Sequence, residues 1–72
     1  MLTVSEVAAS IVARQAAVDF IGIQRGLPEL GIVDLVLFKD RVTHSTLALP
    51  LSQLTRERIR AKVRESRERF RL

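Results

Sequence analysis

The chain has 72 residues, 47% hydrophobic and 28% charged, which is enough for one small globular domain and too apolar for a disordered segment. It contains no cysteine and a single histidine, His44, so it offers no disulfide framework, no thiolate chemistry and too few ligands for a metal site. Twelve Lys and Arg against eight Asp and Glu give a formal net charge of +4. We therefore expect a single domain over residues 1–72 that is not an enzyme and holds no metal or cofactor.

The first predicted element is a helix over about residues 4–25. Thr3 and Glu6 have the spacing of a capping box, in which a hydroxyl accepts from the amide three residues later. Gly26 and Pro28 are typical of a helix end, because glycine adopts the left-handed conformation after the last turn and proline cannot continue the helix. A helix with this composition is apolar on several sides, so we expect a second subunit to cover part of it.

The middle of the chain predicts a β-hairpin with strands at about 32–38 and 43–49. The first segment is short, β-branched and aromatic, and Asp40 is a suitable first residue for the turn that follows. Both faces of this hairpin are apolar, and a two-stranded ribbon is marginal alone. We therefore expect the helices to cover one face and another subunit to meet the other face or the exposed strand edge.

The last predicted element is a helix over about residues 56–70, with Thr55 as its N-cap. Its apolar side is a narrow stripe, and nearly every other position is charged. The predicted fold is thus a small α+β domain of order α-β-β-α. The stripe consists of Ile59, Val63, Ser66 and Phe70.

Five arginines of this helix repeat at four- and three-residue spacing and form one ridge beside the apolar stripe. Like charges at this spacing repel each other unless an anionic surface faces them, so the ridge is the predicted partner-binding site. Arginine favours this interpretation, because its planar guanidinium binds carboxylates and phosphates through two hydrogen bonds. The alternative is a solvated, solubilising face. The ridge consists of Arg56, Arg60, Arg64, Arg67 and Arg71.

The predicted partner is an acidic protein surface, and the predicted function is regulation or inhibition of a larger protein. Small size and the absence of a catalytic constellation are typical of regulators encoded by phages or mobile elements. This comparison concerns the general type of protein and is based on no sequence motif. The alternative is a nucleic-acid-binding protein that contacts phosphates through the same helix. That alternative is weaker, because Tyr and Trp are absent and the three Phe fit core positions rather than base-stacking positions.

A homodimer is expected, because one chain of this length cannot cover both the apolar helix and the apolar hairpin. The sequence also lacks an apolar run near the ~20 residues that a membrane span needs. Its start, MLTVSEV, has no basic region of a secretory signal, so we expect a cytoplasmic protein. The residues expected in the dimer interface are Ile11, Val18, Val36 and Phe38.

Asp40, His44 and Ser45 are close in sequence and could be considered as an acid, a base and a nucleophile. Such a group needs mutual hydrogen bonds and a cleft that excludes water. An exposed hairpin turn in so small a domain provides no such cleft. We therefore interpret Asp40 as a turn residue and His44 as an edge-strand residue without a catalytic role.

Overall fold

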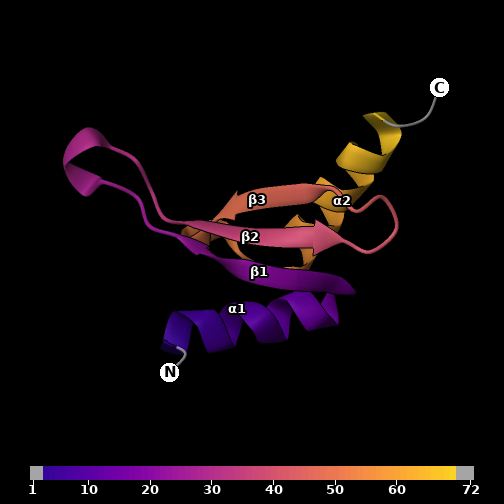
Figure 1. Ribbon diagram of the computed structural model, residues 1–72, viewed down its shortest axis with the longest axis horizontal. Helices are drawn as coiled ribbons and strands as arrows, with labels where there is room; N and C mark the ends of the chain where they lie inside the picture. The colour runs from indigo at the N-terminus through magenta and orange to yellow at the C-terminus, as the bar shows by residue number, and fades with distance from the viewer. Residues whose placement is uncertain (1–2, 70–72) are drawn as a thin grey trace.

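The computed structural model describes residues 3–69 and has two helices and three strands (Figure 1). The strands form one antiparallel sheet of order β1-β2-β3. Pro28–Leu30 and Leu51–Gln53 are short 3-10 turns. The main elements in chain order are α1 (Val4–Gln15), β1 (Val18–Gln24), β2 (Leu35–Asp40), β3 (Thr46–Pro50) and α2 (Arg56–Arg69).

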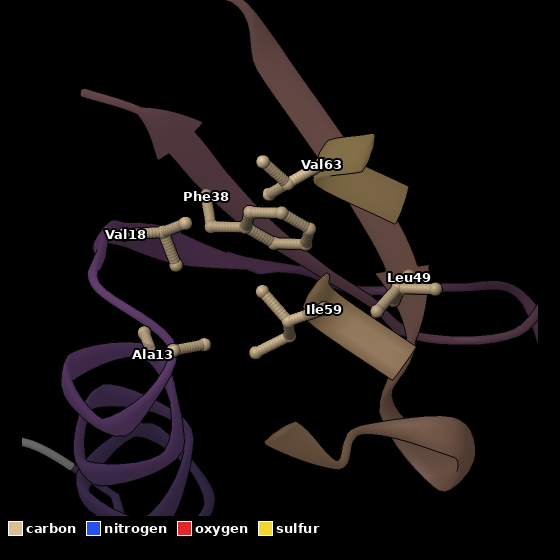
Figure 2. Packing of buried hydrophobic residues seen from close by; sticks show 7 residues of the cluster. Ala13, Val18, Phe38, Leu49, Ile59 and Val63 are labelled. Atoms are coloured by element: carbon tan, nitrogen blue, oxygen red, sulfur yellow. The ribbon is translucent and has the colours of Figure 1, made fainter. Parts of the chain in front are cut away.

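Both helices pack on the same face of the sheet, and the core lies between this face and the helices. In β2 the residues alternate strictly, with Val36, Phe38 and Asp40 buried on the helix side and Leu35 and Leu37 partly exposed on the other. Figure 2 shows Phe38 at the centre of the cluster, facing side chains from all the other main elements. The buried cluster consists of Ala13, Ala16, Val18, Phe38, Leu49, Ile59 and Val63.

The predicted helix over 4–25 is wrong in its second half. Helix α1 ends at Gln15, Ala16 caps it, and Ala17 adopts a left-handed conformation with φ of 59°. The chain then continues as strand β1, which pairs with β2 along its length and has a bulge between Phe20 and Gly22. Tertiary pairing outweighs helix propensity here, because β1 converts a marginal two-stranded ribbon into a three-stranded sheet.

The predicted role of Gly26 as a left-handed helix cap is therefore also wrong. Gly26 lies after β1, where its backbone passes so close to the carbonyl of Ile32 that a Cβ atom would collide with it. The left-handed glycine is Gly31, with φ of 71°, which ends the turn Pro28–Leu30. Gly26 is thus required by a close approach of two backbone segments, and Gly31 by the backbone conformation.

The α+β class is confirmed, with the order α-β-β-β-α in place of α-β-β-α. The two expected strands exist but are shifted toward the C-terminus, to Leu35–Asp40 and Thr46–Pro50. Residues 32–34 belong instead to the connection after β1, in which Ile32 makes an isolated bridge to Leu27.

Both predicted helix starts are confirmed. The Thr3 hydroxyl accepts a hydrogen bond from the Glu6 amide, and the Thr55 hydroxyl accepts one from the Arg58 amide, each at 3.1 Å. The carboxylate of Glu6 accepts from the Thr3 hydroxyl rather than from the cap amide. In the apolar stripe of α2, the buried residues are Ile59, Val63 and Ser66, whereas Phe70 lies outside the described residues.

Candidate partner-binding site on the basic helix

Helix α2 concentrates the positive charge of the chain on its solvent-facing sides. Its 14 residues include seven Arg or Lys and three Glu. Because only a narrow stripe of the helix is buried, its other side chains are directed toward solvent or toward the neighbouring elements. A helix of this kind presents its basic side chains as a row that can reach a partner.

A groove of about 790 Å³ lies between α2 and the junction of α1 with β1. Figure 1 shows this junction where α1 ends and β1 begins, and α1 contacts α2 directly. The apolar side of the groove is formed by small and branched side chains, and charged residues of α2 line the remainder. The lining residues are Ala16, Ala17, Val18, Glu57, Arg60, Val63, Arg64, Arg67 and Glu68.

Arg67 is held by a carboxylate inside the protein. Its Nε donates to Asp40 Oδ2 and its Nη2 to Asp40 Oδ1, both at 2.9 Å, so the two planar groups form a bidentate ion pair. The side chain of Asp40 is fully buried, whereas that of Arg67 is 46% exposed. The pair ties the last turns of α2 to the end of β2, 27 residues earlier in the chain.

The carboxylate of Asp40 also organises the turn between β2 and β3. The Val42 amide donates to Oδ1 at 2.9 Å and the Thr43 hydroxyl to Oδ2 at 3.1 Å. The hydrogen bonds from Arg67 hold the pKa of the Asp40 carboxyl well below its usual range, although burial by itself would raise it. Asp40 is therefore an ionised, fully hydrogen-bonded structural residue, and the prediction that it initiates the turn is confirmed.

Arg60 and Arg64 differ from Arg67, because neither has an ion-pair partner within residues 3–69. They lie one turn apart and both line the groove. Arg69 pairs with Glu65 at 3.1 Å, as the sequence spacing indicates, whereas Arg64 and Glu68 form no ion pair. The groove thus contains two basic side chains that form no ion pair with a carboxylate of the described chain, although Glu57 and Glu68 also line it.

The five arginines of the predicted ridge therefore have different surroundings in the structure. Arg60 and Arg64 face the groove, Arg67 lines it but is bound to Asp40, and Arg56 is exposed in the first turn of α2 outside the groove. Arg71 lies outside the described residues. Sequence reasoning did not identify Asp40 as the partner of Arg67. The available signal was the two-residue period of Val36, Phe38 and Asp40, which places a carboxylate on the buried side of a strand.

Ala17 forms part of the groove in an uncommon backbone conformation. It is exposed and has φ of 59°, a region that alanine occupies only at an energetic cost. Residues with such backbone strain are often found at binding sites. Here the conformation turns the chain sharply from α1 into β1, so that the junction faces Arg60 and Arg64 across the groove.

The residues expected in a dimer interface have other positions in the structure. Val18, Val36 and Phe38 are 3%, 1% and 0% exposed within a single chain, so they have almost no surface to offer a second subunit. The sheet and the two helices of the same chain already cover these three side chains. Ile11 is 50% exposed on α1 and remains accessible.

The turn residues considered for catalysis do not form a relay. The Asp40 carboxylate is bound by Arg67, Val42 and Thr43, and neither it nor Ser45 is hydrogen-bonded to the His44 side chain. His44 is exposed and adopts φ of 60° in the turn before β3, so the interpretation of it as an edge-strand residue is wrong. Within residues 3–69, no three His, Cys, Asp or Glu side chains form a group that could hold a metal ion.

Comparisons with family models, curated protein sequences and solved structures found no match to this chain. None of the helices in the described part of the chain has the length and apolar character needed to cross a membrane. The groove along α2 is therefore the feature of the described chain that indicates a function, through its geometry and charge.

Proposed function

We propose that the protein is a non-enzymatic regulator or inhibitor that binds an acidic segment of a larger, cytoplasmic protein in the groove along α2. The observation that carries this proposal is the pair Arg60 and Arg64, which line the groove without a carboxylate partner in the described chain. Two guanidiniums one helical turn apart can bind two carboxylates of a partner through bidentate hydrogen bonds.

The composition of the groove favours a protein segment as its occupant. Ala16, Ala17, Val18 and Val63 provide apolar surface, which suits the side chains of a peptide. Glu57 and Glu68 also line the groove. They would repel a continuous row of phosphates, whereas an acidic peptide segment can place its carboxylates at Arg60 and Arg64 and its neutral or basic side chains at the two glutamates. Arg60 lies one turn from Val63 and is the residue expected to contribute most, since few residues carry most of an interface energy.

The alternative function is binding of nucleic acid through the outer face of α2. The net charge of +4 and the exposed residues Arg56 and Arg58 favour it, because phosphate contacts need only accessible cations. In that case all exposed basic residues of α2 would contribute similarly, and affinity would fall steeply with salt concentration. The two functions therefore predict different mutation patterns.

Affinity capture from a lysate of the native host, with nuclease treatment, separates these functions. The test variant is Arg60→Glu/Arg64→Glu, in the groove. The control is Arg58→Glu/Lys62→Glu, which has the same spacing on the same helix and changes the charge equally, but involves residues that do not line the groove. A protein retained by the wild type and the control, and lost from the test variant, supports the proposal.

Two results would count against the proposed protein contact. If both double variants lose the captured protein equally, binding is general charge attraction rather than recognition in the groove. If nuclease treatment removes the binding, and both double variants shift a labelled DNA or RNA equally less than the wild type, the nucleic-acid alternative is correct.

A further inference from the structure

The connection between β1 and β2, residues 25–34, projects from one end of the sheet and is called the arm here (Figure 1). Hydrogen bonds hold it in a defined shape. The Gly26 amide donates to Asp34 Oδ1 at 2.7 Å, and Arg25 Nη1 donates to Asp34 Oδ2 at 3.4 Å. Farther out, the Ile32 amide donates to the Leu27 carbonyl at 3.1 Å. The arm is therefore ordered before any partner arrives, which lowers the entropic cost of binding.

The arm exposes large apolar side chains at an unusual density. Leu30 is 70% exposed at its turn, and three further apolar residues of the arm are about half exposed. Isolated exposed hydrophobic residues are ordinary on protein surfaces, whereas a contiguous group of them marks an interaction surface. The other three are Leu27, Ile32 and Val33.

A shallow hollow of about 480 Å³ lies beside these side chains, lined mainly by Pro28, Ile32, Val33 and Leu51. The arm thus carries both an exposed apolar residue, Leu30, and an apolar hollow that Pro28 and Gly31, close to Leu30 in sequence, help to line. A two-fold interface requires such self-complementarity, because each copy must present the same surface to the other.

The charge distribution is compatible with a second copy of the chain at this surface. Arg25 and Asp34 neutralise each other at the base of the arm, which leaves Glu29 as its only other charged residue. In Figure 1 the arm lies at one end of the molecule, and the last turns of α2 lie at the other end. The longest dimension of the molecule is 40 Å, several times the screening length of about 8 Å at physiological salt, so the two basic helices would repel each other little.

From these observations we infer that two copies of the chain associate through their arms, with Leu30 of each copy seated in the apolar hollow of the other. This interface does not involve the groove along α2, so it stands independently of the proposed function. Stable interfaces commonly bury about 800 Å² on each partner, and the arm is only a small part of the surface. The dimer is therefore in concentration-dependent equilibrium with the monomer.

Sedimentation velocity over a wide concentration range tests the inference on the purified full chain. The wild type should approach twice the chain mass of 8.1 kDa as its concentration rises. Leu30→Asp should raise the dimer dissociation constant at least about tenfold, because it places a charge in an apolar contact. Circular dichroism of each variant should show the wild-type spectrum, since the substituted side chain is mostly exposed.

Two control variants make the result specific. Val42→Asp changes a residue that is 68% exposed in the turn at the opposite end of the sheet, and Val4→Asp changes one that is 87% exposed on α1. Both should dimerise like the wild type. A wild type that stays at 8.1 kDa at every concentration would overturn the inference. So would equal weakening by all three variants, or a loss of dimer confined to Val4→Asp, which would place the contact on α1.

Discussion

The last turns of α2 and the middle of the same helix use arginine in two different ways. Arg67, near the end, is bound through two hydrogen bonds to a buried carboxylate and joins α2 to β2. Arg60 and Arg64, in the middle, face a groove and have no ion-pair partner in the described chain. Sequence spacing places all three arginines on one ridge, yet only Arg67 forms an ion pair that stabilises the fold.

The difference between them arises from which residues of the other elements lie near each arginine. Asp40 ends β2 on its buried side, where a charge must be paired and fully hydrogen-bonded to be tolerated. Arg60 and Arg64 share their groove with Ala16 and Ala17, which offer no acceptor side chain, and they form no ion pair with the glutamates that also line it. An arginine ridge can thus combine structural and binding roles, and substitutions should separate them.

The largest effect is expected from Arg67→Ala, which leaves the buried Asp40 carboxylate without its cation. Breaking a fully buried ion pair costs about 3–5 kcal/mol, and we expect at most the lower part of this range because Arg67 is half exposed and Val42 and Thr43 still donate to Asp40. Urea unfolding measures the loss. The matched control is Arg69→Ala, which removes an exposed pair with Glu65 and should cost less than about 1 kcal/mol.

Acid should weaken the fold through the same pair. The pKa of Asp40 is lower in the folded chain than in the unfolded chain, so the pair contributes its full stability above about pH 4 and loses it as the pH falls further. Measuring the free energy of unfolding from pH 7 to pH 2 checks this. Asp40→Asn should be less stable at neutral pH and should show a smaller decline in acid. An identical decline in both proteins would assign the acid sensitivity to other carboxylates.

A smaller effect is expected from Arg67→Lys, which keeps the positive charge but cannot form the bidentate pair. Losing one hydrogen bond to a charged group should cost about 1.5–3 kcal/mol, less than the complete truncation of Arg67. Thermal unfolding of the lysine and alanine variants side by side measures the difference. Equal stability of the two variants would mean that the geometry of the pair, not its charge, provides the entire stabilisation.

The parts of the fold that follow from neighbouring residues could be predicted from the sequence. The caps at Thr3 and Thr55 depend on a hydroxyl and an amide three residues away, and the stripe of Ile59 and Val63 depends only on helical periodicity. In these cases the local pattern and the tertiary structure favour the same conformation.

Strand β1 could not be predicted in this way, because its local signals favoured a helix end. The pattern of a helix terminus is present at Gly26, Leu27 and Pro28, yet these residues lie in the arm. The sequence did contain a contrary indication, since the expected helix was apolar on too many sides and the expected two-stranded sheet was marginal. A third strand over Val18–Gln24 resolves both problems within one chain.

Local sequence patterns could also not predict which arginines of the ridge form an ion pair within the chain. The partner of Arg67 is 27 residues away, and only the sheet register brings Asp40 under the end of α2. The groove that Arg60 and Arg64 line is likewise formed in part by the left-handed turn at Ala17, where the sequence has no glycine or proline to indicate a turn. Spacing therefore identified the candidate residues, and the tertiary structure determined which of them are available to a partner.

The most direct test of this division is the free energy of unfolding of Arg60→Ala/Arg64→Ala, measured in urea at neutral pH. If the two arginines are available for a partner and contribute nothing to the fold, the double variant should match the wild type within about 0.5 kcal/mol. A loss of several kcal/mol, comparable with that of Arg67→Ala, would contradict the account, because it would show that the middle of α2 is also committed to holding the fold together.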